Sequence, residues 1–295
     1  MRDTAAAAFQ NRNDEAPFDA VAPTYDETFT SSHIGRAQRE LITRELDHVF
    51  HAGERVLELN CGTGIDAIHL AGRGVKVLAC DISSRMIEMA RQSAARAGRK
   101  SCLPAPAAFR ALATEEIGRL RREGLDGQFD GALSNFAGLN CIADLRSTAC
   151  DLAALLKPGA PFLLCVFGHF CAWEVIWYLG HGKPSKAFRR LRRAGSVVRL
   201  ADGASVWIHY PPVRELARIF APEFKLKKWS GIGITVPPTY LETFAIRFPK
   251  LFNVFSSLDR GLGSLPLARG MADHVLLKFE RDHYDRSLQS EGNPV

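Results

Sequence analysis

The chain has 295 residues with a hydrophobic content of 46%, which is enough for a packed core and excludes a wholly disordered protein. Its formal net charge of +6 is modest for this length. A nucleic-acid partner is therefore not expected, since such binding needs a clustered basic face. The seven cysteines include no C-x-x-C pair, which favours reduced thiols and a cytoplasmic protein. The N-terminal residues lack the apolar core of a signal peptide, so we expect none.

The N-terminal segment 18–50 has a helical pattern, and strands and helices then alternate along the chain. Apolar runs predict strands at 55–60, 75–80, 107–112, 129–134 and 161–167. Helical periodicity predicts helices at 64–72, 83–97, 114–123 and 144–156. Ser83 is the expected N-cap of the second of these helices. This alternation is typical of a doubly wound α/β fold, in which a mostly parallel sheet carries helices on both faces.

The pattern changes after residue 167, where two insertions interrupt the alternation. Between the insertions we expect a strand at 205–210, a helix at 213–220 and a strand at 224–231, and a final strand at 274–280. We expect a single domain over 18–281, flanked by a flexible N-terminus (1–17) and a flexible tail (282–295). Within the domain, 18–50 form an N-terminal cap, and 168–204 and 232–272 are the insertions on the substrate side.

Residues 160–180 are mostly apolar and have the length of a membrane span. Glu174 lies inside this stretch, and a charge in mid-span costs about 2.5–3.5 kcal/mol on the insertion scale. A buried strand followed by a separate helix from about Phe170 explains the run better.

The most informative stretch of the chain is 55–81. A buried strand leads into the turn Cys61-Gly62-Thr63-Gly64, and a second apolar strand ends in Asp81. Glycines at the first turn and an acidic residue after the second strand are typical of a nucleoside-binding βαβ unit. Glu58 within the first strand disfavours the pyrophosphate of a nicotinamide dinucleotide. It favours a ligand that carries an ammonium group and hydroxyls, such as S-adenosylmethionine (SAM).

These motifs resemble those of the class I SAM-dependent methyltransferases, in their ubiquinone/menaquinone-methyltransferase-like branch. Residues 58–64 are similar to the first motif of the family, 129–136 to the fourth, and 156–159 to the turn before the fifth strand. Residues 18–26 are similar to the N-terminal cap of that branch. The resemblance implies a Rossmann-like methyltransferase fold with a seven-stranded sheet and an antiparallel last strand. It also implies SAM as the cofactor and S-adenosylhomocysteine as its product.

The resemblance implies a role for each residue that matches a motif. The first-motif loop holds the methionine part of the cofactor, Asp81 binds the ribose hydroxyls, and Tyr25 lies over the cofactor. Arg39 is a candidate partner for the cofactor carboxylate. The expected cofactor-binding residues are Tyr25, Arg39, Glu58, Asn60, Gly62, Gly64, Asp81, Ile82, Met86, Ala113, Thr114, Ser134 and Asn135.

The sequence departs from the family pattern at two positions. Ala113 and Thr114 stand where the third motif usually has an acidic residue, so adenine recognition there would fall to backbone groups. Asn60 stands where a glycine is common, which we expect to tighten the turn.

The chain lacks the Asp/Asn-Pro-Pro-Tyr/Phe tetrapeptide after the fourth strand, which in this family marks amino-group methylation, and this favours a small-molecule acceptor. His169 follows the fifth strand and is the candidate general base, with a satisfied loop histidine as the alternative. His33, Phe136 and Trp173 are the candidate acceptor-binding residues. No histidine pair has metal-ligand spacing, so we predict no metal site.

Both insertions have a distinctive composition. Residues 183–199 are strongly basic and follow an aromatic run, which is typical of either a membrane-surface element or a solvated basic face. Phe244, Phe248, Phe252 and Phe255 fall on one helical face, either as core or as the wall of an apolar acceptor pocket. Together the two features favour an apolar, aromatic or lipidic acceptor.

The sequence therefore predicts in-line transfer of a methyl group from SAM to a small acceptor of this kind. Two alternatives stay open, a nicotinamide-dependent oxidoreductase and a non-catalytic SAM-binding or membrane-associated protein.

Overall fold

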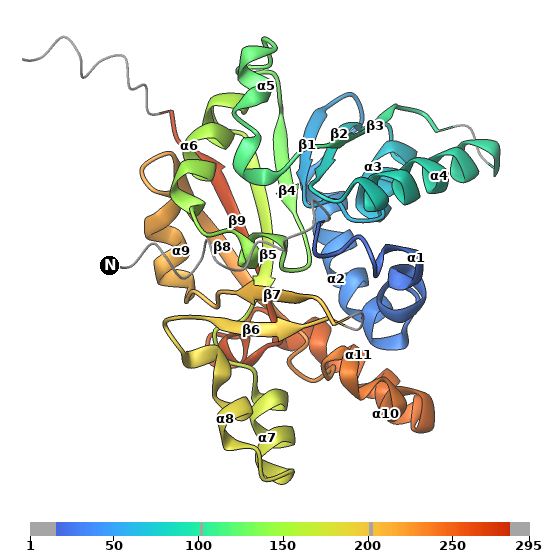
Figure 1. Ribbon diagram of the computed structural model, residues 1–295, viewed down its shortest axis with the longest axis vertical. Helices are drawn as coiled ribbons and strands as arrows, with labels where there is room; N and C mark the ends of the chain where they lie inside the picture. Colours follow the sequence, from blue (N-terminus) through green and yellow to red (C-terminus); the bar gives the residue numbers. More distant parts are fainter. Residues whose placement is uncertain (1–15, 101–102, 201–202, 284–295) are drawn as a thin grey trace, which may run out of the picture.

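The computed structural model describes residues 16–100, 103–200 and 203–283. Its centre is a seven-stranded sheet with strand order β3-β2-β1-β4-β5-β9-β8 (Figure 1). The neighbouring pairs among the first five strands are parallel, and β9 is antiparallel to both of its neighbours. The predicted doubly wound fold with an antiparallel last strand is confirmed. The strands are β1 (Arg55–Leu59), β2 (Lys76–Asp81), β3 (Ala107–Ala111), β4 (Gly131–Ser134), β5 (Pro161–Phe167), β8 (Phe224–Ile232) and β9 (His274–Arg281).

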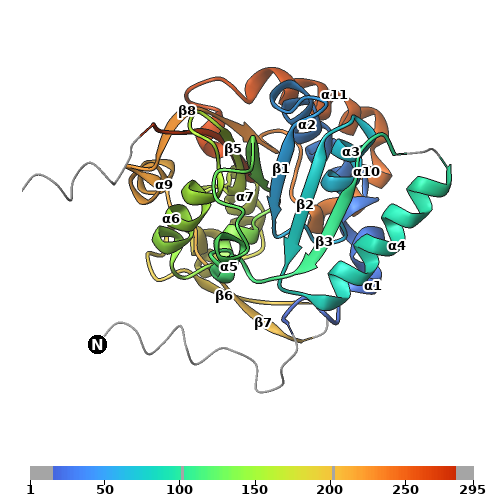
Figure 2. The same cartoon turned by 90° about the horizontal axis from the view of Figure 1, so that it is seen from above.

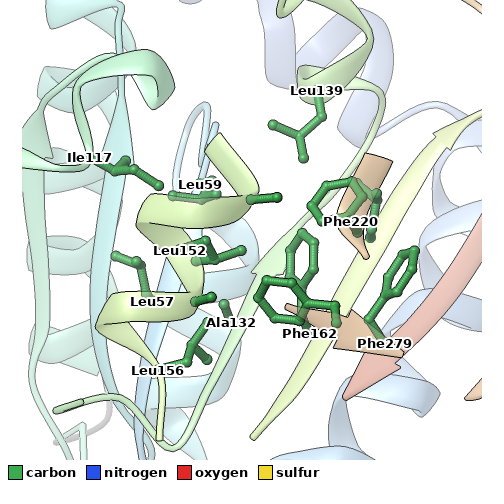
Figure 3. Close-up of a cluster of buried hydrophobic side chains, with 14 of the residues drawn as sticks. Leu57, Leu59, Ile117, Ala132, Leu139, Leu152, Leu156, Phe162, Phe220 and Phe279 are labelled. Atoms are coloured by element: carbon green, nitrogen blue, oxygen red, sulfur yellow. The ribbon is translucent and has the colours of Figure 1, made fainter. Parts of the chain in front are cut away.

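Helices cover both faces of the sheet (Figure 2). One face packs against α2 (His33–Val49), α3 (Ile65–Gly72) and α4 (Ser84–Lys100). The other packs against α5 (Arg119–Arg122), α6 (Leu145–Leu155) and α9 (Val213–Phe220). Each face of the sheet has its own cluster of buried apolar side chains. Successive side chains of β1 point to opposite faces, so Val56 packs in the first cluster, with α2, α3 and α4, and Leu57 in the second, with α5, α6 and α9. Figure 3 shows the second cluster, where Leu57 and Phe162 of the sheet lie near Leu152 of α6 and Phe220 of α9.

The predicted N-terminal helical segment is broken into three pieces, α1 (Ala22–Tyr25), a π-helical turn η2 (Asp26–Thr30) and α2. Ser32 is the N-cap of α2, since its side chain accepts a hydrogen bond from the backbone N–H of Gly35. The close approach of this turn requires Gly35, because a Cβ there would lie 2.0 Å from the carbonyl oxygen of Phe29. The N-terminal cap therefore folds back at residue 32 instead of continuing as one helix.

Two further expectations differ from the structure. The strand expected at 205–210 is β7 (Ser205–Ile208), which pairs with β6 (Ser196–Arg199) in a separate hairpin outside the main sheet. The helix expected at 114–123 is a 3₁₀ turn η3 (Thr114–Glu116) followed by α5, with Gly118 packed closely on Asp151 of α6 between them. The predicted flexible ends, 1–17 and 282–295, lie largely outside the described residues.

Both insertions lie at the end of the molecule towards which β5 points (Figure 1). The first contains α7 (Ala172–Gly180), α8 (Pro184–Ala187), η5 (Arg189–Leu191) and β6, and the second contains η6 (Thr239–Leu241), α10 (Glu242–Arg247), α11 (Pro249–Leu262) and η7 (Arg269–Met271). The expected phenylalanine stripe does not lie on one helix, because α10 ends before Phe248 and α11 starts at Pro249. Phe252 is buried, whereas Phe248 is 48% exposed.

The apolar run 160–180 is divided between β5 and α7. Across residues 16–100, 103–200 and 203–283, no helix combines the length and the apolar character needed to cross a membrane.

A buried ion network attaches the first insertion to the sheet. Arg190 donates from Nε to Glu174 (2.9 Å) and from Nη2 to Asp273 (2.6 Å), and Arg189 donates from Nε to Glu174 (2.5 Å). Glu174, Arg190 and Asp273 are at most 4% exposed. The expectation that the basic run 183–199 faces outward as a whole is therefore wrong at Arg189 and Arg190. Their charges are needed inside, where Glu174 and Asp273 would otherwise be buried without partners.

We expect Arg190→Ala to lower the free energy of unfolding by about 3–5 kcal/mol, because it removes the buried cation that Glu174 and Asp273 share. Arg192→Ala is the matched control, since Arg192 is exposed in the same insertion, and we expect a change within about 0.5 kcal/mol. Urea denaturation followed by circular dichroism measures both. Equal midpoints for the two variants would contradict a structural role for the network.

Candidate cofactor and acceptor site

The loop after β1 is held in left-handed backbone conformations at Asn60 (φ 55°), Gly62 (φ 53°) and Gly64 (φ 77°). A Cβ on Gly64 would lie 2.6 Å from the ring of Phe109, so this glycine allows the loop to pack on β3. A Cβ on Gly62 would meet nothing within 4 Å. The backbone of Gly62 is therefore accessible to a ligand, while Gly64 ends the loop as the N-cap residue of α3.

Asn60 takes the place of a glycine without opening the turn, because asparagine tolerates the left-handed conformation. Its Oδ1 accepts hydrogen bonds from Thr114 Oγ1 and Ser134 Oγ, both at 3.2 Å. A Cβ on Gly138 would lie 2.3 Å from the Cβ of Asn60, so the loop after β4 also packs on it. Asn60 thus joins the ends of β1, β3 and β4, which brings Thr114 and Ser134 to the predicted site.

Asp81 lies at the end of β2 and faces the first loop. Its carboxylate accepts hydrogen bonds from the backbone N–H of Gly62 (2.8 Å) and of Ser83 (2.9 Å). Burial raises the pKa of Asp81, and these two hydrogen bonds oppose the rise. Ile82 beside it is 51% exposed and offers apolar surface, whereas Met86 is 3% exposed and lies in the core. Ala113, half-buried, precedes η3.

Four polar residues form a buried cluster beside this loop. Asp66 of α3 accepts from Arg39 Nη1 of α2 and from Asn135 Nδ2 after β4, each at 2.9 Å. Glu58 of β1 is 2% exposed. Burial raises the pKa of Glu58 well above its usual value, the nearby charge of Asp66 adds to this rise, and Arg39 opposes it.

Three buried atoms of this cluster have no hydrogen-bond partner, namely Arg39 Nε, Glu58 Oε2 and Asn135 Oδ1. Buried polar atoms are nearly always paired in folded proteins, so such a group indicates a ligand that supplies the partners. The set offers two acceptors, which suit an ammonium group, and a cationic donor, which suits a carboxylate. The methionine part of SAM carries both groups, and the residues present therefore fit SAM.

The N-terminal cap is hydrogen-bonded onto the loop and the end of β2. Asp26 accepts from Thr63 Oγ1 at 2.7 Å, and Asp19 accepts from the hydroxyl of Ser83. Burial raises the pKa of Tyr25 to about 12, so its hydroxyl stays protonated at neutral pH and can donate. The Tyr25 ring lies 5.6 Å from the ring of Phe29, between centroids.

An aromatic row lies next to the polar cluster. Phe136 and Ala137, in the loop after β4, have φ values of 51° and 68°, which are strained for residues other than glycine. The Arg39 guanidinium lies 4.5 Å from the centroid of the Phe136 ring. The row runs from Phe29 through Phe136 and His274 to Phe167, with centroid distances of 5.1, 5.8 and 4.7 Å.

His274 is a site residue that the sequence did not indicate. It is paired with Phe167 in the antiparallel register of β5 and β9, and this pairing places it at the carboxyl edge of β5. It is 3% exposed, and its Nδ1 lies 3.3 Å from Asp273 Oδ2. The sequence gives no indication that a histidine at the start of the last strand belongs to the site, because only the pairing of β9 with β5 brings it to this edge.

The three remaining candidates have different surroundings. The Nδ1 of His169 lies 2.6 Å from the carbonyl oxygen of Tyr210, so Nδ1 carries the proton and Nε2 is an acceptor. His33 pairs with Glu242 at 2.8 Å and is 47% exposed, and Trp173 donates to the carbonyl of Thr235 at 3.1 Å. His33 and Trp173 therefore join the second insertion to α2 and α7.

Comparison with known proteins adds to this geometry. Residues 56–159 match a family described as a methyltransferase domain. A demethylmenaquinone methyltransferase from Clavibacter sepedonicus is 33% identical over 154 residues, covering 52% of this chain and 57% of that protein. A demethylmenaquinone methyltransferase from Corynebacterium urealyticum is 28% identical over 222 residues, covering 73% of this chain and 85% of that protein. The chain thus spans little more than half the length of the first of these relatives.

Solved structures share the fold at low identity. A SAM-dependent methyltransferase from Methanosarcina mazei superposes with a TM-score of 0.54 at 16% identity, covering 81% of this chain and 97% of that one. A protein from Pyrococcus horikoshii superposes with a TM-score of 0.55 at 16% identity, covering 90% and 99%. Residues 56–159 thus match a methyltransferase domain, the superpositions show the Rossmann-like methyltransferase fold, and the buried polar cluster fits SAM. The cofactor is SAM, and the nicotinamide alternative is set aside.

We expect Asp81→Ala to weaken SAM binding by about 1–3 kcal/mol, the usual worth of a charge-assisted hydrogen bond to a hydroxyl. Asp126→Ala is the matched control, since Asp126 is an exposed aspartate in the turn after α5. Isothermal titration calorimetry measures both affinities. An affinity unchanged from wild type in Asp81→Ala would remove Asp81 from the site.

We expect Glu58→Gln to stabilise the ligand-free protein by on the order of 1 kcal/mol in mild alkali, because it removes a buried carboxylate with an unpaired oxygen. The gain should vanish in mild acid, since a carboxyl whose pKa is raised by folding destabilises the fold only above its usual pKa. The same variant should bind SAM more weakly. Thermal melts across pH and calorimetry test this, with exposed Glu88→Gln as the control. A pH-independent difference would count against it.

Proposed function

We propose that this protein transfers the methyl group of SAM to a ring carbon of a lipophilic quinol of the demethylmenaquinone kind. One observation carries the proposal. The guanidinium of Arg39 contacts both Asp66 of the cofactor cluster and the ring of Phe136, so an aromatic row begins where the methionine part of SAM is expected to end. The names of the curated relatives support the same acceptor class.

The chemistry of the acceptor follows from the transfer. SAM supplies an activated methyl group on a sulfonium. A new bond from that methyl to carbon requires an electron-rich ring, which the reduced quinol has and the oxidised quinone lacks. The ring carbon then loses one proton to restore aromaticity, so the site needs a proton acceptor within reach. Phe29, Phe136 and Phe167 offer the flat apolar surfaces on which such a ring can be aligned.

His169 is the proposed proton acceptor. Its Nδ1–H donates to the carbonyl of Tyr210, which fixes the tautomer and leaves Nε2 able to take a proton. Tyr210 belongs to a small core with Val206 and Ile208, and Phe18 and Phe167 pack against it. The imidazole is therefore attached to the hairpin beside one end of the aromatic row.

The direct test uses SAM with a labelled methyl group and a short-chain demethylmenaquinone, chemically reduced or left oxidised, with a simple phenol for comparison. We expect the labelled methyl group to appear in the reduced demethylmenaquinone only, and neither in the oxidised form nor in the phenol. Asp81→Ala serves as the control for cofactor-dependent transfer. Transfer to the phenol but not to the quinol would overturn the acceptor class. Tight SAM binding without transfer to any acceptor would favour the non-catalytic alternative.

We expect His169→Gln to lower kcat by about 10²–10⁴-fold, the usual contribution of general base catalysis, while SAM affinity stays within about twofold. His274→Gln is the comparison, because it removes the other histidine of this edge. A large loss in His274→Gln with a normal rate in His169→Gln would move the base to His274.

A further inference from the structure

The first insertion presents large apolar side chains to solvent. Ile176, Trp177 and Leu179 of α7 are 67%, 38% and 47% exposed, and Phe188 and Leu191 are each 43% exposed. The opposite side of α7 is held in place, because Glu174 is 1% exposed in its ion network and Trp173 packs on the second insertion. The helix is therefore amphipathic with its outer side left apolar.

The second insertion repeats this arrangement. Leu251, Val254 and Leu258 of α11 follow each other at three and four residues and are 44%, 53% and 49% exposed. They form an apolar stripe on one side of the helix, while Phe252 and Asp259 on the other side are buried. Ile246 on the preceding helix α10 is also exposed, at 61%.

The two apolar surfaces belong to one end of the molecule. The ring of Tyr178 in α7 lies 5.9 Å from that of Tyr240 in η6, and Trp173 packs on both Phe244 and Phe255. Figure 1 shows α7, α8, α10 and α11 together at the end towards which β5 points. We name the exposed apolar residues of α7, α10, α11 and the segment 188–191, with Phe248 between α10 and α11, the apolar face: Ile176, Trp177, Leu179, Phe188, Leu191, Ile246, Phe248, Leu251, Val254 and Leu258.

The charges of the insertions are sorted by sign. Within the described residues of 168–204 and 232–272, the acidic residues are Glu174, Glu242 and Asp259. Glu174 pairs with Arg190, Glu242 accepts from the backbone N–H of His33, and Asp259 accepts from the backbone N–H groups of the loop after β8. Cations remain at the surface around the apolar face: Lys183, Lys186, Arg192, Arg193, Arg199, Arg247, Lys250 and Arg260.

We propose that the apolar face and its surrounding cations form a docking surface for an anionic lipid bilayer. Exposed aliphatic and aromatic residues among cations that outnumber the local carboxylates match a surface with negative headgroups over an apolar interior. A second copy of this chain fits less well, since the cations of the two copies would face each other. The docking surface does not depend on the proposed acceptor, although a lipidic acceptor would gain a short path to the aromatic row.

The test is co-sedimentation of the full chain with vesicles of phosphatidylcholine alone and of equal parts phosphatidylcholine and phosphatidylglycerol. We expect binding to the anionic vesicles that weakens with added salt. The double variant Lys183→Glu/Lys186→Glu should lower the partition coefficient by roughly tenfold or more. Ile176→Ser/Val254→Ser should also weaken binding, by removing apolar contacts.

Arg96→Glu/Arg99→Glu is the matched control, because it makes the same charge change on exposed positions of α4, away from the insertions (Figure 1). It should bind like wild type, and circular dichroism melts establish that every variant is folded. Three results would overturn the proposal. They are equal partition onto neutral and anionic vesicles, an equal loss in the α4 control, and self-association in sedimentation velocity that the Ile176→Ser/Val254→Ser variant abolishes.

Discussion

The ion pair between Arg39 and Asp66 is the contact on which the rest of the site depends. It joins α2 of the N-terminal cap to α3, and Asn135 extends it to the end of β4. The same guanidinium lies over Phe136, the second ring of the aromatic row. The guanidinium of Arg39 therefore lies between the polar cluster, which suits the methionine part of SAM, and the aromatic surface proposed for the acceptor. Burial raises the pKa of Glu58 beside it, and the ammonium group of a bound ligand would favour its ionised form.

Much of this arrangement can be predicted from sequence, because it depends on local signals. The run before Gly62 and the apolar strand ending in Asp81 are close in the chain, and their spacing alone places them at one edge of a parallel sheet. The residues that were missed depend on distant pairing. In the sequence, Asp66 looks like an ordinary acidic residue in the first turn of a helix. Its role in the site depends on its partners Arg39 and Asn135, which are distant in the chain. His274 reaches the site only through the register of β9 against β5.

The insertions show a related limit of sequence reasoning. Their composition indicates apolar and basic surfaces, yet Arg189 and Arg190 face inward because Glu174 and Asp273 are buried there. Charge runs in sequence do not tell which cations are used for internal pairing. Here the pairing turns Glu174 inward together with Arg189 and Arg190, so the exposed part of the run keeps the cations Lys183, Lys186, Arg192, Arg193 and Arg199. The same network fixes the insertion to the start of β9, next to the aromatic row.

A crystal structure with S-adenosylhomocysteine tests the central claim most directly. The account predicts that the homocysteine carboxylate lies within hydrogen-bond distance of Arg39, and its amino group within that distance of Glu58. It also predicts that the sulfur faces the ring of Phe136. A complex in which the homocysteine part is held by other residues, with Arg39 bound only to Asp66 and Phe136, would contradict it.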